Sequence, residues 1–177
     1  MNSPLVCVYG FISEKLGKVL FYIKETKAFN TEDFVRCFKY LYNDPRLKFD
    51  DVVLFADNAT LHKTPQVWKG LTDNSLKILF NMPYRPDLMG IESTWQRCKH
   101  IYKNKIAKKL VHQKKVNNFK IVKKVIKELK NEDCIADAAN GWKHLLAAKP
   151  KDYPGPFAEG DSTPEASSSD CDEEEQE

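Results

Sequence analysis

The order in which strand-like and helix-like segments follow one another in the first 80 residues constrains the fold more than any other feature. Two apolar runs at 5–12 (LVCVYGFI) and 19–23 (VLFYI) flank a short polar connection with a glycine, a pattern that predicts a β-hairpin. The next predicted elements are a helix beginning at Asn30 or Thr31, a strand at 52–56, a short helix from Thr64-Pro65 to Gly70 and a strand at 76–80. This order predicts an α/β fold, a mixed sheet whose later strands are parallel and whose faces are covered by helices.

The second half of the chain is predicted to be helical. Apolar residues recur at helical spacing from Ile91, and further helices are predicted at about 118–130 and 134–148. Trp95 and Trp142 fall on these apolar stripes and are predicted to be core residues. Proline, glycine, serine and acidic residues dominate the last part of the chain, a composition typical of disorder. We therefore expect one domain over residues 1–149 and a disordered acidic tail over 150–177.

Charge is divided unevenly along the chain, although the net charge is only +3. Residues 151–177 carry ten acidic side chains and one lysine, which leaves 27 Lys and Arg against 15 Asp and Glu, a net charge of +12, in the rest. A body this basic favours a polyanionic partner such as nucleic acid. The five cysteines show no spacing typical of a zinc site or a disulfide framework, and no apolar run is long enough for a membrane span.

Two carboxylates stand where the predicted elements would bring them together. Asp57 directly follows the strand at 52–56, and Glu92 lies in the first turn of the helix that begins at Ile91. A carboxylate after a strand is often no more than the start of a turn. A pair of carboxylates from a strand end and a helix start can instead share divalent cations, because Mg²⁺ prefers oxygen ligands. Two such ions clamp the attacking and leaving oxygens of phosphodiester chemistry.

The motifs around these carboxylates, DNATLH at 57–62 and PYRPDLMGIESTW at 83–95, resemble those of mariner-superfamily transposases. The gap of 34 residues between Asp57 and Glu92 is also found in one large branch of that family. The resemblance extends over about 5–146 and implies an RNase H-like fold with metal-dependent DNA cleavage and strand transfer. It makes Asp57 the second and Glu92 the third acid of a DDE triad, both catalytic and both ligands of Mg²⁺ or Mn²⁺. The supporting motif residues are then Asn58, His62, Pro83, Tyr84 and Asp87.

The sequence departs from the family pattern in the loop before Glu92 and in the first acid. Arg85 stands where the family has serine, and Met89-Gly90 stands where it has Asn-Pro. The family's first Asp lies on a strand before the hairpin, whereas the earliest aspartate here, Asp33, is predicted at a helix start. We therefore expect an N-terminally incomplete catalytic domain that is inactive as this chain.

Two of the motif residues have plainer alternatives to a role in catalysis. His62 could approach a bound phosphate, but a lone histidine is more often structural. Asp87 follows Pro86 in a loop, where an acid more often begins a turn or caps a helix than binds a metal.

A strongly basic segment follows Glu92. Residues 97–130 contain twelve lysines and one arginine but a single acid, Glu128. Most of the lysines avoid the apolar stripes, which favours a phosphate-contacting surface over an ordinary solvated face of mixed sign. The predicted DNA-contacting residues are Arg97, Lys99, Lys103, Lys108, Lys109, Lys114, Lys115, Lys123 and Lys124. DNA is thus the expected partner, the nucleus the expected location, and no membrane is expected.

Three hypotheses about function remain open at this stage. The chain is a degenerate or domesticated DNA-binding module, or one segment of an active transposase completed by an upstream segment or a partner chain. Alternatively it is a non-enzymatic interaction protein that reuses the fold. A homo-oligomer is compatible with each of them.

Overall fold

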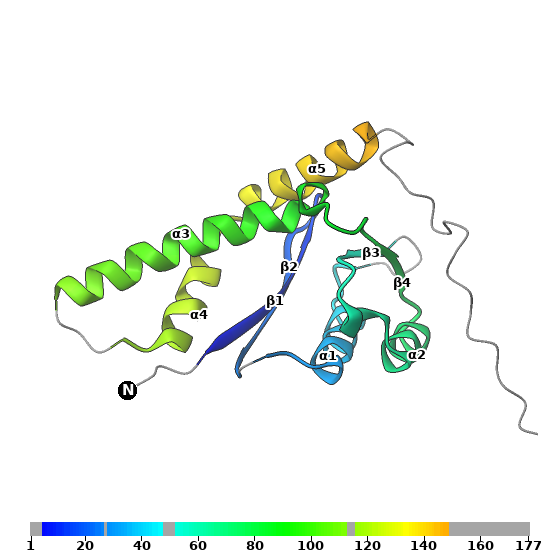
Figure 1. The fold of residues 1–177 in the computed structure, drawn as a ribbon, viewed down its shortest axis with the longest axis horizontal. Coiled ribbons are helices and arrows are strands. Elements are labelled where there is room, and N and C mark those ends of the chain that lie inside the picture. The colour runs from blue at the N-terminus through cyan, green and yellow to red at the C-terminus, as the bar shows by residue number, and fades with distance from the viewer. Residues whose placement is uncertain (1–4, 27, 48–51, 113–115, 149–177) are drawn as a thin grey trace, which may run out of the picture. The chain divides into compact units, whose positions relative to one another are not determined.

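The computed structural model describes residues 5–26, 28–47, 52–112 and 116–148, and Met1–Ala147 forms one compact unit (Figure 1). In chain order the elements are β1 (Val6–Ser13), β2 (Gly17–Glu25), α1 (Thr31–Tyr42), β3 (Val53–Ala56), the 3-10 helix η2 (Thr60–Lys63), α2 (Pro65–Asp73), β4 (Lys77–Phe80), the 3-10 helix η3 (Pro86–Leu88), α3 (Gly90–Val111), α4 (Asn118–Glu128) and α5 (Asn131–Ala147). No helix among the described residues is long and apolar enough to cross a membrane. The predicted disordered tail falls in the second unit, Ala148–Glu177, and lies outside the described residues.

The predicted hairpin is confirmed: β1 and β2 pair in antiparallel register. Gly17 closes the turn with a φ of 69°, a left-handed conformation that glycine adopts without steric cost. The side chain of Asn131, at the start of α5, donates to the Leu16 carbonyl and accepts from the Lys18 amide, each at 2.9 Å. The turn is therefore tied to the first residue of a helix more than 100 positions later in the chain.

Helix α1 begins at the predicted position because Asn30 caps it. Asn30 Oδ1 accepts from the Asp33 amide at 2.9 Å and Asp33 Oδ2 accepts from the Asn30 amide at 3.3 Å, which is a reciprocal capping box. Asp33 is only 2% exposed, and its carboxylate accepts hydrogen bonds from Lys24 Nζ of β2 at 2.8 and 2.9 Å. This aspartate therefore starts a helix and joins it to the hairpin, as its predicted position at a helix start requires.

Replacing Asp33 by alanine is expected to lower the free energy of unfolding by about 1–2 kcal/mol, because the variant loses one half of the capping box. Urea denaturation measures the change. Asp33→Asn retains an oxygen that can accept from the Asn30 amide but loses the charge opposite Lys24, so its loss should be smaller. An Asp33→Ala midpoint equal to that of the wild-type chain would contradict the capping role.

Strands β3 and β4 are parallel, as predicted, and α2 forms the crossover between them. The predicted end of α2 at Gly70 is wrong: the helix continues to Asp73, and Gly70 lies buried within it. A Cβ atom on Gly70 would lie 2.9 Å from Cγ1 of Val35 in α1. Glycine stands here because α1 and α2 approach closely, so a packing requirement looks in the sequence like a helix terminator.

The four described strands form two sheets of two strands, whereas the sequence predicts one mixed sheet. Within the described residues, β1 pairs with β2 alone and β3 pairs with β4 alone. Residues of β1 and β3 line a common cleft and share no ladder. Which strands pair with one another is not predictable from periodicity, because the alternation of apolar residues identifies a strand but not its neighbours.

Two apolar clusters hold these elements together. The first is formed by Phe34, Phe38, Leu41, Val67, Leu71 and Leu76, and the second by Cys98, Ile121, Val125 and Leu129. Trp95 packs against the second cluster, edge-on to Phe21 with 5.8 Å between ring centres, which agrees with its predicted core position. Trp142 is 37% exposed and stacks on Phe55, so its predicted burial in the core is wrong. Trp142 thus contacts β3 through Phe55 while part of its side chain remains in solvent.

Candidate metal and DNA site

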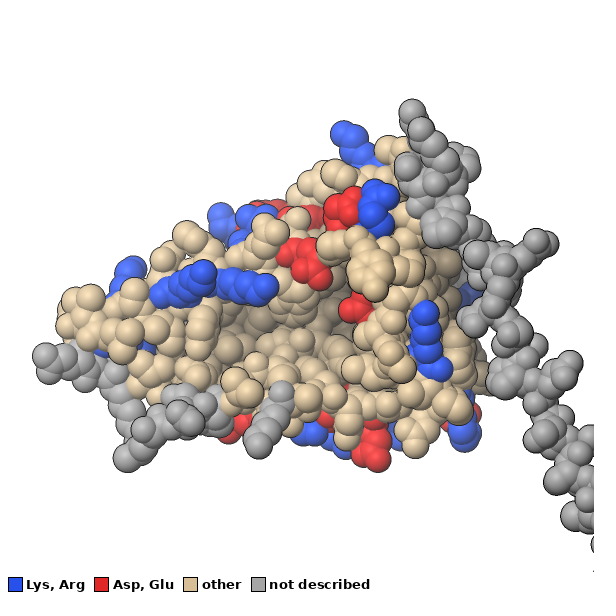
Figure 2. All heavy atoms as spheres, in the orientation of Figure 1, with Lys and Arg blue, Asp and Glu red and all other residues tan. Residues whose placement is uncertain are grey.

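A cleft of about 810 Å³ is lined by β1, β3, the start of α3 and part of α5. Figure 2 shows the hollow, with acidic side chains at its rim. Asp57, after the end of β3, and Glu92, in the first turn of α3, both line this cleft. Apolar side chains such as Phe11 and Phe55 make up much of the remaining wall. The structure thus brings the two predicted metal ligands to one cleft, and their sharing of one ion stays a prediction.

Asp57 directly follows the end of β3, and its side chain bonds to the backbone of the turn that it begins. Its Oδ1 accepts from the Ala59 amide at 3.0 Å, and its side chain is 60% exposed. The neighbouring His62 imidazole lowers the pKa of the Asp57 carboxyl, while partial burial opposes that shift. The carboxylate is therefore charged at neutral pH, which is the form that binds a hard cation.

His62 is buried behind this carboxylate. Its Nδ1 lies 2.8 Å from Asp57 Oδ1, close enough for an ion pair although the contact is not aligned as a hydrogen bond. The imidazole packs 4.1 Å from the ring centre of Phe34 and 6.1 Å from that of Tyr9. Only 9% of the His62 side chain is exposed, so the imidazole contacts the Asp57 carboxylate from the interior of the protein. This burial favours the structural alternative for His62.

The loop after β4 is connected to the end of β3 through asparagine side chains. Ala56 and Phe80 are paired in the parallel ladder, so the residues that follow them are neighbours. The Asn58 side-chain amide donates to the Asn81 carbonyl, and the Asn81 side-chain amide donates to the Arg85 carbonyl at 2.6 Å. Asn58 therefore connects the ends of β3 and β4 by a hydrogen bond.

The same loop carries Pro83, Tyr84 and Asp87. Asp87 lies in the first turn of η3 and forms an ion pair of 2.9 Å with Arg85, which agrees with the predicted turn role. Pro83 is exposed, and Tyr84 is 99% exposed with a φ of 61°. Arg85, which replaces the family's serine, is thus engaged within the loop.

Glu92 owes its position to a close crossing of α3 and α5. A Cβ atom on Gly90 would clash with the carbonyl oxygen of Asp137, and one on Gly141 would clash with the backbone nitrogen of Gly90. The helices therefore meet backbone to backbone two residues before Glu92. That carboxylate is exposed on the turn that this contact fixes.

A buried acid that was not predicted from the sequence, Asp137, stabilises the same crossing. Asp137 is 5% exposed and accepts hydrogen bonds from Thr94 Oγ1 at 2.8 Å and from an Arg97 guanidinium nitrogen at 3.1 Å. Thr94 is fully buried, and Arg97 also lies 3.8 Å from Asp133. The sequence signal that could have found Asp137 is its position on α5 next to an apolar residue, Ala138, that is itself buried. Arg97, a predicted DNA contact, is thus also a link between α3 and α5.

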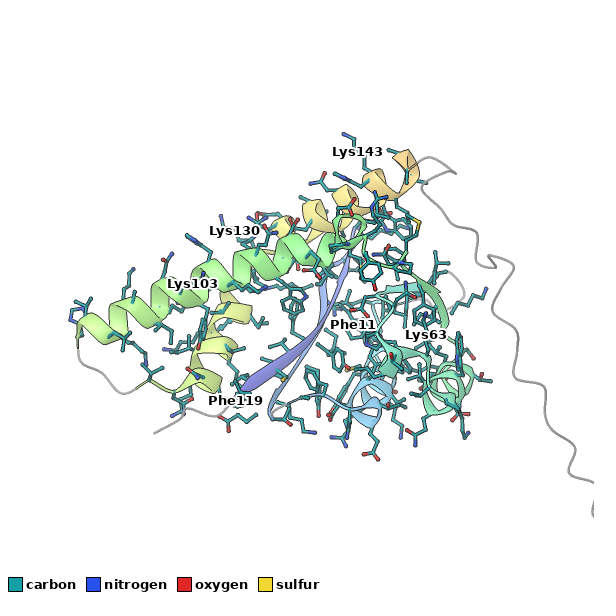
Figure 3. The ribbon with its side chains drawn as sticks, viewed as in Figure 1. Phe11, Lys63, Lys103, Phe119, Lys130 and Lys143 are labelled. Atoms are coloured by element: carbon teal, nitrogen blue, oxygen red, sulfur yellow. The ribbon has the colours of Figure 1, made fainter. Side chains whose placement is uncertain are left out.

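Six of the other predicted DNA-contacting lysines lie on α3 and α4. Lys99, Lys103, Lys108, Lys123 and Lys124 are exposed, Lys109 is partly buried, and Lys114 and Lys115 lie outside the described residues. Figure 3 labels Lys103 on α3 and Lys130, which lies between α4 and α5. The single acid of the segment, Glu128, pairs with Lys105 at 2.5 Å and so neutralises a lysine outside the predicted set.

The residues available for a metal ion are few. Across the part of the chain that the structure describes, no group of three or more His, Cys, Asp or Glu side chains could hold one. Asp57 and Glu92 remain as two carboxylates on one cleft. Such a pair fits Mg²⁺, which is usually bound through one or two carboxylates together with water and substrate phosphate.

Comparison with known proteins identifies the family. The model of the DDE superfamily endonucleases matches residues 2–113, more than half of the chain, and this range contains both Asp57 and Glu92. No curated protein matches the chain. The mixed α/β architecture, with two small sheets and five α-helices in the described residues, is consistent with an RNase H-like DDE domain followed by helices. The chain belongs to the DDE superfamily of endonucleases.

Proposed function

We propose that this chain is a transposase-derived DNA-binding protein of mariner type that holds DNA at the cleft but does not cleave it alone. The observation that carries the proposal is that Asp57 and Glu92, from separate elements, line one cleft. The family implies DNA as the substrate. A DNA partner also makes the nucleus the proposed location.

Asp57 and Glu92 would hold Mg²⁺ or Mn²⁺ in this proposal. When bound, such an ion activates the attacking oxygen and stabilises the charge that builds on phosphate. The protein contributes a carboxylate kept ionised beside His62 and a second carboxylate fixed by the α3–α5 crossing. Phe11 and Phe55 form part of the apolar wall beside the two carboxylates, which themselves remain open to solvent.

The proposed DNA surface is the exposed lysine set on α3 and α4. These side chains add affinity by displacing counterions from phosphate and do not read base sequence. Lys99 and Lys103 lie on the same helix as Glu92, seven and eleven positions after it and therefore on the same face of α3. A strand bound along this helix would therefore run toward the two carboxylates.

A second candidate function is that of one segment in an enzyme completed by another chain or by an upstream segment. Two strands favour it, because β1 and β3 each have one edge unpaired within the described residues and both line the cleft. An extended strand placed between them could pair with both edges. A carboxylate on such a strand would supply the acid that the family pattern places before the hairpin.

The purified chain is expected not to nick supercoiled DNA in the presence of Mg²⁺ or Mn²⁺. The clamp needs ligands for ions at both the attacking and the leaving oxygen, and two carboxylates supply too few. Gel analysis of plasmid topology measures the result for the wild-type chain, Asp57→Ala and Glu92→Ala. All three should match the buffer control.

Glu132→Ala is the matched control, since Glu132 is an exposed acid on α5 that does not line the cleft. Nicking by the wild-type chain and by Glu132→Ala, but by neither cleft variant, would contradict the proposal of inactivity. That outcome would favour a site completed by a second copy of the chain. Nicking by all four proteins equally would indicate a contaminating nuclease.

A further inference from the structure

Tyr84 is the third residue of a turn closed by a hydrogen bond from the Arg85 amide to the Met82 carbonyl at 3.4 Å, a position that favours glycine or asparagine. It is 99% exposed, so its ring contributes almost no burial to the fold. Its φ of 61° lies in the left-handed region, which is unfavourable for a bulky residue that is not glycine or asparagine. Strained residues of this kind persist where the surrounding structure holds them in place, and they concentrate at functional sites.

The surrounding structure does hold this residue. Asn81 Oδ1 accepts from the Met82 amide at 2.8 Å, and the Asn81 side-chain amide donates to the Arg85 carbonyl at 2.6 Å. These bonds close the loop on both sides of Tyr84. Arg85 is in turn paired with Asp87 at the start of η3. Tyr84 is thus an exposed ring on a loop whose conformation is fixed by hydrogen bonds and an ion pair.

The loop occupies a defined place relative to the cleft. The first residue of the loop, Asn81, directly follows β4, the strand that is paired with β3. The Asn81 carbonyl accepts a hydrogen bond from the side chain of Asn58, the residue after Asp57. The other end of the loop runs through Leu88 and Met89, which line the cleft, into the helix that carries Glu92. Tyr84 therefore lies on the loop that joins β4 to the helix carrying Glu92, next to the cleft lining but not part of it.

We infer that Tyr84 is a stacking platform for an unpaired nucleobase of the DNA strand whose phosphate lies at the cleft. An exposed aromatic ring offers a face on which any base can stack, so such a contact is independent of sequence. Bases within a duplex are already stacked on both faces, so the ring selects an unpaired overhang or a base turned out of the helix. This inference rests on the proposed DNA-binding function and adds a preference for unpaired nucleotides.

The test compares binding of two labelled DNAs by fluorescence anisotropy, a blunt duplex and the same duplex with a short unpaired overhang. The wild-type chain should bind the overhang DNA more tightly. Tyr84→Ala should lose about 5- to 150-fold of affinity for the overhang DNA and keep its affinity for the blunt DNA. Tyr84→Phe retains the ring and should retain the preference.

Two further variants separate stacking from folding. Tyr40→Ala is the matched control, because Tyr40 is a half-exposed tyrosine on α1 and not on the loop between β4 and α3. It should bind both DNAs as the wild-type chain does. Tyr84→Asn should lose the overhang preference while raising the Tm by about 2–4 °C, since asparagine tolerates the left-handed backbone. A lower Tm together with weaker binding to both DNAs would indicate a structural role and overturn the inference.

The remaining outcomes are distinguishable. A wild-type chain that binds both DNAs equally, or a Tyr84→Ala variant that keeps the preference, overturns the stacking role and leaves DNA binding intact. A wild-type chain that binds neither DNA overturns the proposed function and the inference together. Quenching of 2-aminopurine placed in the overhang, present with wild type and absent with Tyr84→Ala, supports direct stacking.

Discussion

Gly141→Ala is expected to lower the free energy of unfolding by about 3 kcal/mol, the upper part of the range for overpacked interiors. The added methyl group would meet the backbone of Gly90, and a backbone atom cannot move aside as a flexible side chain can. Because the same contact fixes the first turn of α3, the variant should also shift Glu92. Chemical denaturation measures the stability change, and amide exchange measures protection at the start of α3.

Asn140→Ala is the matched control for this variant. Asn140 is the exposed neighbour of Gly141 on α5, and alanine there improves helix propensity without meeting another element. It should leave stability unchanged or slightly raised. If Gly141→Ala were as stable as the wild-type chain, α3 and α5 would have to be separable at the crossing, and the account of Glu92 would be wrong.

Binding of the chain to duplex DNA is expected to weaken on the order of 10³-fold between about 50 and 200 mM salt, as for proteins with six or more phosphate contacts. The reason is the release of condensed counterions when lysines of α3 and α4 neutralise phosphates. Anisotropy titrations at several salt concentrations give the slope of log K against log salt. Charge reversal of Lys103 and Lys124 together should make this slope about two units shallower.

One control variant and one deletion variant accompany the titration. Lys69→Glu changes an exposed lysine of α2 that pairs with Asp73 and should leave the slope unchanged. Deletion of residues 151–177, which removes ten acidic side chains and one lysine, should tighten binding because those acids compete with phosphate for the same lysines. A flat salt dependence of the wild-type chain would contradict the phosphate-contacting surface.

Local patterns predicted the elements well because their signals lie within a few residues. The Asn30 cap, the hairpin and the parallel β3–β4 pair all follow from short segments of sequence. The placement of Asp57 after a strand and Glu92 in a first helical turn followed from the same patterns. Neither residue had to be found by a long-range argument.

Features that depend on contacts between distant segments were not predicted. Gly70 and Gly141 are required by neighbouring helices, and nothing in their own segments distinguishes such a glycine from a helix end. Asp137 carries no mark of its partner Thr94, which lies 43 positions earlier in the chain. Helix α5 begins at Asn131, before the predicted start at about 134, and the bond from the Asn131 side chain to the hairpin turn could not be predicted from the local sequence.

The position of His62 among rings has a practical consequence for spectroscopy. Its imidazole lies beside Phe34 of α1 and Tyr9 of β1, and it touches Asp57 at the cleft. Ring currents from the two aromatic side chains displace the resonances of its carbon-bound protons. A cation at Asp57 and a movement of the hairpin would each change those resonances, the first through the charge placed beside the imidazole and the second through ring geometry. His62 is therefore a built-in NMR reporter that distinguishes metal loading from rearrangement of the fold.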